Sequence, residues 1–297
     1  MASGHYWVKS VDSTREAASK MSALSKLADI DRRVFYWILF IALMVPFLNP
    51  IGFPITIAPN TQDLYDGISG DQVDEGEVWI INFGYGVSAW SECHPAVTVC
   101  TKALFREGAK IIFIGPHYDV ELTYNKLQDT CREDFATKEY GVDYVFLGYF
   151  TGGESVVAQL ASDIASVFPE DHFGTPIGEI PMMDGVEDVH NIDGVLSSDT
   201  GDYGGHFMTQ WQGPYGTKLA EVGIAMNGST DLPRWQAGNF FGVSVGSRGG
   251  AELELLIGEL GEATTAMDSI SVSHLLLVLA IIIGNLGTIT EKLGGKE

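Results

Sequence analysis

VWIINFGYG (residues 78–86) is the stretch that decides the fold of this chain: an almost uninterrupted apolar run that ends in Gly-Tyr-Gly. A strand with one solvent-facing side alternates between apolar and polar residues, whereas a run without alternation is typical of a strand buried on both faces, as in a parallel sheet. Similar runs predict four further strands, at 110–115, 143–150, 193–199 and 221–227.

Helical patterns lie between these runs. We expect helices over 95–107, 119–139, 151–168 and 249–260, and a helical stretch that ends near Trp211. Strands that alternate with helices form βαβ units, which set the strands parallel and place helices on both faces of the sheet. We therefore predict an α/β fold, a Rossmann-like or flavodoxin-like domain with a mainly parallel five-stranded sheet. This likeness at the level of the fold carries no function with it.

Two apolar stretches bracket the domain. Residues 34–53 contain no charged side chain, and residues 271–290 are interrupted by few polar side chains. About 20 apolar residues in a helix are enough to cross a hydrocarbon core about 30 Å thick. Both stretches are therefore predicted to be transmembrane helices, although Pro46 and Pro50 are expected to kink the first one or end it early.

Positive charges near the two termini predict the orientation. Cytoplasmic flanks of membrane spans are rich in Lys and Arg, and the flanking residues of this kind are Lys20, Lys26, Arg32, Arg33, Lys292 and Lys296. Both termini are therefore expected in the cytoplasm, with the central domain on the other side of the cell membrane. The predicted organisation is a cytoplasmic amphipathic arm (1–33), a first transmembrane helix (34–53), an acidic α/β domain (54–270), a second transmembrane helix (271–290) and a cytoplasmic tail (291–297).

The central part is strongly acidic. It holds nine Lys and Arg residues against 33 Asp and Glu residues, a net charge of −24. Nucleic-acid binding needs basic patches, so nucleic acid is excluded as a partner. The acidity favours cations or basic partners, or it is simply a well-solvated surface.

The three cysteines, Cys93, Cys100 and Cys131, do not have the spacing of a zinc or redox motif. Two interpretations stay open: buried structural thiols, or one disulfide from Cys131 to a neighbouring helix. The sequence also lacks the glycine motifs that bind dinucleotides and nucleoside triphosphates, and the nucleophile elbow of esterases. We therefore predict no cofactor.

The carboxyl ends of the strands are where an open parallel sheet binds ligands. Three residues after predicted strands, His117, Asp119 and Asp199, are candidate catalytic residues, because a histidine and carboxyl groups are the usual general acids and bases. Most doubly wound domains have a comparable rim, so the alternative is that these side chains have no catalytic role.

Two other sets of rim residues are candidate binding sites. Thr151, Gly152 and Gly153 precede a predicted helix, whose N-terminus favours an anion; the alternative is a tight strand-to-helix turn. Asp199 and Asp202 are candidate ligands for a hard cation, and the alternative is a capped turn with a solvated acidic face.

The C-terminal part contains candidate interface residues. The segment 233–250 is rich in glycine and aromatic residues, which suggests close packing against the sheet, the membrane surface or another subunit. Within it, Arg234 and Arg248 are expected to meet carboxylates across an interface or in an intramolecular ion pair. In the second apolar stretch, the small and polar residues Gly284, Asn285 and Gly287 favour helix association.

We predict a non-enzymatic scaffold, a membrane-anchored subunit whose partners are the lipid bilayer and either copies of itself or other membrane subunits. Two alternatives stay open. The first is a membrane-bound hydrolase, which requires His117, Asp119 and Asp199 to converge. The second is a domain that senses a ligand or cation and signals through its spans.

Overall fold

The computed structural model of the chain describes residues 31–294 and, within them, all side chains except those at 32, 284 and 286–294. Most of the predicted arm (1–30) and the end of the predicted tail (295–297) lie outside the described residues. The chain divides into two compact units. Residues 52–267 form the α/β unit, and the described parts of 1–51 and 268–297 belong to the other.

The α/β unit is built on one six-stranded sheet in which every neighbouring pair of strands is parallel. Its strands are β1 (Val78–Gly84), β2 (Lys110–Gly115), β3 (Tyr144–Tyr149), β4 (Gly194–Asp199), β5 (Lys218–Gly223) and β6 (Gly242–Val245). The strand order β3-β2-β1-β4-β5-β6 is the doubly wound order of Rossmann-type sheets. The order reverses between β1 and β4, which is where such sheets bind ligands.

The predicted α/β fold with a parallel sheet is confirmed, but two details of the strands are wrong. The fifth strand covers Lys218–Gly223 instead of 221–227, because the apolar residues after Gly223 form a 3₁₀ turn, Ala225–Asn227. The sixth strand, Gly242–Val245, was not predicted. It has only four residues and lies inside the glycine-rich segment (233–250), so no long apolar run indicates a strand there.

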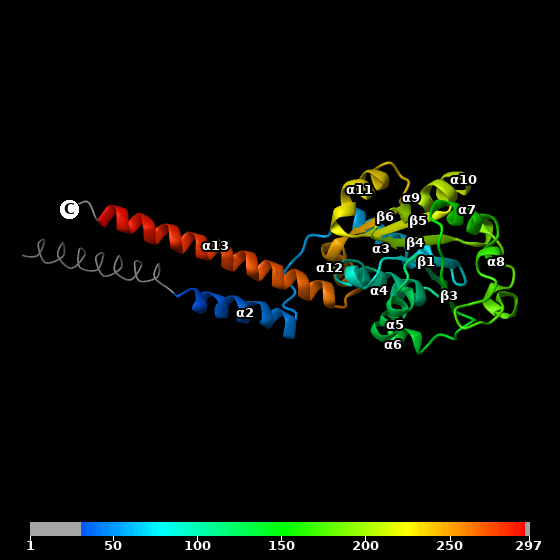
Figure 1. Ribbon diagram of the computed structural model, residues 1–297, viewed down its shortest axis with the longest axis horizontal. Helices are drawn as coiled ribbons and strands as arrows, with labels where there is room; N and C mark the ends of the chain where they lie inside the picture. Colours follow the sequence, from blue (N-terminus) through cyan, green and yellow to red (C-terminus); the bar gives the residue numbers. More distant parts are fainter. Residues whose placement is uncertain (1–30, 295–297) are drawn as a thin grey trace, which may run out of the picture. The chain divides into compact units, whose positions relative to one another are not determined.

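Helices cover both faces of the sheet. The α-helices of this unit are α3 (Pro59–Gly67), α4 (Trp90–Arg106), α5 (Val120–Thr130), α6 (Arg132–Phe135), α7 (Glu154–Ser162), α8 (Ile164–Val167), α9 (Tyr203–Phe207), α10 (Gly213–Tyr215), α11 (Gly228–Gln236), α12 (Gly246–Ile257) and the start of α13 (Glu262–Gly294). A π-helical turn, Met208–Gln212, follows α9. Short 3₁₀ turns lie at Gly70–Gln72, Val87–Ala89, Ile177–Glu179, Pro181–Met183, Val189–Asn191 and Ala225–Asn227. Figure 1 shows α7 and α9 on one side of the sheet and α4 and α5 on the other.

Each face has its own apolar core. On the α4 side, Phe83 and Phe113 are buried with their rings stacked, at 5.7 Å between centroids. On the α9 side, Phe207 and Trp211 are wholly buried. Each such side chain contributes about 1.5–3 kcal/mol of burial free energy, so these two layers fix the positions of the strand ends.

The three cysteines belong to this core. Cys93, Cys100 and Cys131 are free and buried, so the interpretation as buried thiols is confirmed and the disulfide alternative is wrong. Burial raises the pKa of the Cys131 thiol to about 12, and the thiols are therefore unreactive in the folded domain.

The glycine-rich segment packs against the sheet, as one of its three interpretations predicted. It contributes the end of α11, all of β6 and the start of α12. A Cβ atom on Gly242 would overlap the backbone of Leu64 in α3. The glycine is therefore needed so that α3 can lie directly on β6.

The other unit contains α2 (Arg32–Leu48) and the rest of α13. Within residues 31–294, one helix is long and apolar enough to cross a membrane, at Glu262–Ile283, which has 22 residues. The prediction of two spans is not supported. The α2 helix has 17 residues, about 25 Å at 1.5 Å per residue, because it stops before Asn49 and Pro50.

Candidate functional site

The loop Gly84–Gly86, here called the β1 loop, lies at the point where the strand order reverses. The register of β1 and β4 puts Gly84 opposite Asp199, and a Cβ atom on Gly84 would lie 2.5 Å from the Cβ of Asp199. A Cβ atom on Gly86 would lie 2.5 Å from Cε1 of His117. The two glycines therefore let the ends of β4 and β2 approach β1 from both sides.

His117 and Asp119 form a hydrogen-bonded pair on one side of the β1 loop. His117 Nδ1 lies 2.5 Å from Asp119 Oδ1, and Asp119 Oδ2 accepts from the Val87 N–H at 2.9 Å. The aspartate is largely buried while a third of the histidine side chain is exposed. This is how a carboxylate orients an imidazole so that Nε2 acts as the general base.

Asp199 lies on the other side of the β1 loop and is buried. Its Oδ2 accepts from the Gly204 N–H at 2.8 Å, and Asn227 Nδ2 donates to Oδ1 at 3.4 Å. Burial raises the pKa of Asp199, and the N–H groups around its carboxylate oppose the shift in part. The three candidate catalytic residues therefore all border one loop.

A row of buried polar side chains leads away from this loop, on the face covered by α9. Asn82, Ser197 and Glu221 are direct neighbours in the register of β1, β4 and β5. Asn82 Nδ2 lies 3.4 Å from Ser197 Oγ. The Asn82 Oδ1 atom and both carboxylate oxygens of Glu221 have no hydrogen-bond partner.

Glu221 is the most unusual member of this row. Its side chain is only 1% exposed, and it fits beneath α9 because Gly204 has no side chain there. Burial, followed by the charges of Asp199 and Asp231, raises the pKa of Glu221 well above its ordinary value. A glutamate in this environment keeps its proton to a higher pH than an exposed one.

Arg234 completes a carboxylate cluster, which consists of Asp199, Asp202, Glu221, Asp231 and Arg234. The guanidinium Nη1 lies 2.6 Å from Asp202 Oδ1 and 3.5 Å from Asp231 Oδ1. Asp231 is buried and its Oδ2 has no hydrogen-bond partner. Burial and the charge of Asp199 raise the pKa of Asp231 to about 6.

This arrangement bears on the predicted cation ligands. Asp202 pairs with Arg234 while Asp199 accepts from backbone, so the two carboxylates do not converge on a common point through free oxygens. Among residues 31–294, no group of three or more His, Cys, Asp or Glu side chains is arranged to hold a metal ion. Asp199 is buried, so the alternative of a solvated acidic face does not describe it, and the cation site stays a prediction.

The predicted anion site is a turn before α7. Gly152 and Gly153 have φ angles of 135° and 58°, which side-chain-bearing residues rarely adopt, and Ser155 Oγ donates to the Gly152 carbonyl. The Glu154 carboxylate in the first turn of α7 accepts from Gln210 Nε2. Thr151 is exposed. The alternative of a tight turn therefore accounts for these residues.

The predicted interface residues have intramolecular partners where the structure describes them. Arg248 Nε donates to Glu252 Oε1 at 2.9 Å, and Arg234 belongs to the carboxylate cluster. In α13, Asn285 Nδ2 donates to the Ile281 carbonyl of its own helix. Gly284 and Gly287 lie in the same helix.

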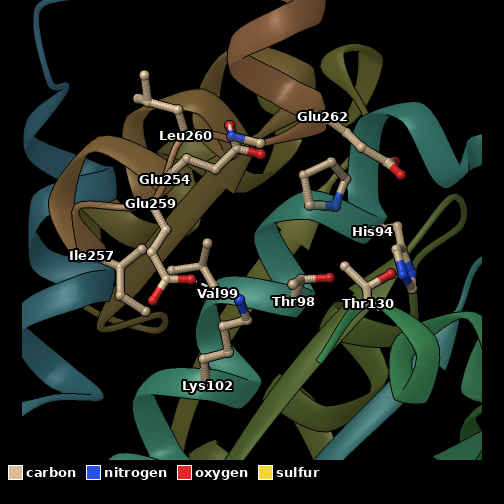
Figure 2. Close-up of a pocket in the computed structure, with 12 residues that line it drawn as sticks. His94, Thr98, Val99, Lys102, Thr130, Glu254, Ile257, Glu259, Leu260 and Glu262 are labelled. Carbon is tan, nitrogen blue, oxygen red and sulfur yellow. Dashed lines mark hydrogen bonds and ion pairs between the residues drawn. The ribbon is translucent and has the colours of Figure 1, made fainter. Parts of the chain in front are cut away.

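A separate cavity of about 240 Å³ lies on the α4 side of the sheet. Figure 2 shows side chains of α4 and of the junction between α12 and α13 grouped around one space. Its lining residues are His94, Pro95, Thr98, Val99, Lys102, Thr130, Glu254, Ile257, Glu259, Leu260, Gly261 and Glu262.

Neither this cavity nor the burial of Glu221 was predicted from the sequence. A lone glutamate inside the apolar stretch KLAEVG (218–223) is the signal that could have identified the latter. No protein-family model, curated protein or solved structure matches this chain. The site is therefore interpreted from its own geometry.

Proposed function

We propose that this protein is a membrane-anchored subunit of a larger membrane assembly, either a homo-oligomer or a complex with other membrane proteins. In this role α13 is the anchor and the acidic α/β unit is the part displayed outside the bilayer. The observation that carries the proposal is the apolar character of α13 over Glu262–Ile283, where few residues are buried within the structure.

The exposed side chains of both helices in the second unit support the proposal. In α13, Leu275, Leu277 and Ile281 are more than half exposed. In α2, the exposed large apolar residues are Val34, Tyr36, Trp37, Ile38, Phe40, Ile41, Val45, Phe47 and Leu48. A helix that is apolar all round needs an apolar environment, which a bilayer or a helical partner supplies.

The topology is proposed from the charges that flank the helices. Lys292 lies near the end of α13 and Lys296 follows the helix, so the C-terminal end is assigned to the cytoplasm and the acidic domain to the opposite side. The N-terminal arm lies in the cytoplasm only if α2 also crosses.

Cysteine labelling tests this topology because the native thiols are buried. Single cysteines replace Ser13 in the arm and Ser155 on the surface of the domain, in membranes of known orientation. A membrane-impermeant maleimide applied from outside is expected to label Ser155→Cys, and it leaves Ser13→Cys unlabelled only if α2 also crosses. Labelling of both from outside would show that α2 does not cross. Release of the unmodified chain by alkaline carbonate would contradict membrane anchoring itself.

A membrane-bound hydrolase is the second candidate, and one observation favours it. His117 and Asp119 are hydrogen-bonded on one side of the β1 loop, and Asp199 borders the same loop from the other side, which is part of the convergence that this function requires. In such an enzyme Asp119 would orient His117, and His117 Nε2 would take a proton from water as the general base.

The hydrolase is tested with p-nitrophenyl acetate and p-nitrophenyl phosphate. Asp119→Asn is expected to lower kcat/KM by about 100-fold or more if His117 is the base. Asp129→Asn is the matched control, since Asp129 is three-quarters exposed and pairs only with Arg132 among the described ion pairs. Equal rates for both variants and the unmodified chain would exclude this role.

A further inference from the structure

A hollow of about 630 Å³ has a balance of charge unlike that of the rest of the α/β unit. It lies between the end of α4, the end of α5, α6 and the segment that follows α12. Four of the nine Lys and Arg residues of the central part line it: Lys102, Arg106, Arg132 and Lys138. Its lining carboxylates are also four: Asp129, Glu133, Asp134 and Glu259. The hollow is therefore balanced, although the central part carries a net charge of −24.

Three of these cations and three of these carboxylates pair with one another inside the chain. The pairs are Lys102–Glu259 (2.7 Å), Lys102–Asp134 (4.0 Å), Arg106–Asp134 (3.8 Å), Arg106–Glu259 and Arg132–Asp129 (2.9 Å). Figure 2 shows the Lys102 and Glu259 side chains facing one another. These ion pairs hold the wall of the hollow together and leave one cation and one carboxylate over.

The two charges left over are those of Lys138 and Glu133. Glu133 is exposed in the first turn of α6, and its carboxylate has no ion pair or hydrogen bond among the described residues. Lys138 is half-buried, and its ammonium lies 5.5 Å from the centre of the Phe105 ring. No carboxylate within residues 31–294 forms an ion pair with it. Both side chains are therefore available to a partner.

A second copy of the chain is the partner that this surface fits. Copies of so acidic a domain repel one another, and the repulsion is weakest where each presents a balanced surface. In a two-fold contact the same surface meets itself, so that residue i of one copy meets residue j of the other and j meets i. A surface of one sign cannot complement itself, whereas one with a free cation and a free carboxylate can.

We propose that a second copy docks at this hollow about a two-fold axis, with Glu133 of each copy paired with Lys138 of the other. The inference rests on the proposed function, because anchoring in one bilayer raises the effective concentration of the copies. Exposed ion pairs are individually weak. A two-fold contact makes each pair twice, and anchored copies need only a modest contact to associate.

Reversal of charge tests the pairing, with the full chain in nanodiscs and mass photometry as the readout. Lys138→Glu places two carboxylates against each other at both ends of the contact, and Glu133→Lys does the same with two ammonium groups. Each variant is expected to lower the ratio of assembled to single copies about tenfold. Higher salt is expected to weaken assembly of the unmodified chain, since exposed charges are screened.

Two combinations separate pairing from folding. The double variant Glu133→Lys/Lys138→Glu restores opposite charges across the contact and is expected to assemble as the unmodified chain does. Co-expression of the two single variants is expected to give mixed assemblies, because each supplies the charge that the other lacks. Lys110→Glu is the control, since it makes the same change of net charge outside the hollow.

The outcomes distinguish this surface from the assembly itself. If the unmodified chain assembles and the two single variants assemble equally well, the surface is wrong while the proposed function stands. The same holds if the double variant stays as weak as the single ones. Loss of a different protein instead of a second copy would show that the occupant is wrong. A single copy of the unmodified chain at every concentration would overturn both proposals.

Discussion

At the scale of single residues, the carboxylate cluster makes the stability of the domain depend on pH in an unusual direction. Glu221 and Asp231 have pKa values raised by burial and by neighbouring carboxylates. Between the pKa of the unfolded chain and that of the folded one, the folded state holds more protons. Stability is therefore full below that window and is lost as the pH rises through it, by about 1.4 kcal/mol per pH unit and group.

For Asp231 this window runs from the ordinary pKa of 3.8 to about 6, and for Glu221 it extends upward from the ordinary pKa of 4.5. We expect a higher thermal midpoint at pH 5 than at pH 7.5, and a smaller difference in Glu221→Gln, which cannot ionise. Thermal unfolding of the full chain in detergent measures both. Glu179→Gln, at an exposed position, is the control. If Glu221→Gln leaves the pH dependence of the thermal midpoint unchanged, ionisation of Glu221 is not its cause.

Single residues also show what the sequence could reveal about the site. His117, Asp119 and Asp199 were found because a parallel sheet gathers the residues that follow its strands at one edge. The contact of Arg234 with Asp231 is local, because the two residues are three positions apart in α11. The contact with Asp202 was not predictable, because Asp202 follows β4 and its distance from α11 depends on packing.

At the scale of elements, Glu254 joins α12 to α13. Its buried carboxylate accepts from three N–H groups at the start of α13 and from the Thr264 hydroxyl. Those N–H groups have no partner within their own helix, and a negative charge there also interacts favourably with the helix dipole.

Glu254→Gln is therefore expected to destabilise the α/β unit by about 2 kcal/mol, a fall of about 4–8 °C in Tm. Faster hydrogen exchange at Gly261–Thr264 should accompany it. Glu262→Gln serves as the control, because Glu262 is exposed and forms a surface ion pair with Lys126. Equal thermal midpoints for Glu254→Gln and Glu262→Gln would contradict the proposal that Glu254 caps the start of α13.

Gly242 tests the packing of α3 on β6. The added methyl group of Gly242→Ala would meet Leu64 backbone, which cannot move aside as a flexible side chain can, so a loss of about 1–3 kcal/mol is expected. Gly178→Ala is the matched control, since no atom lies within 4 Å of the added Cβ. Urea unfolding of both variants gives the comparison; a neutral Gly242→Ala would contradict the close approach.

The same elements show where prediction from sequence reached its limit. Long apolar runs such as β1 and β2 matched the structure closely, since strands buried on both faces have an unambiguous pattern. β6 was not predicted from the sequence because it is only four residues long and its position is set by packing against α3 and β5. The length of α2 was overestimated because apolar character continues beyond Leu48 although the helix does not.

At the scale of the whole molecule, the chain combines an acidic α/β unit with helices that expose apolar side chains. These two surfaces suit different solvents, so we propose that a bilayer takes up α13 while the domain stays in water. Helices of this kind also associate with one another in membranes, which is why we propose an assembly instead of an isolated anchored domain.

The most direct test of that claim is the particle mass of the full chain after mild extraction from membranes, by mass photometry in nanodiscs. The chain has a mass of 32.2 kDa, so an assembly of copies is expected at a single discrete multiple of that value, after subtraction of lipid and scaffold. A complex with other membrane proteins is expected as one larger discrete mass with additional chains. A single copy at every protein concentration would contradict the assembly. Function would then have to be sought among His117, Asp119 and Asp199 at the β1 loop.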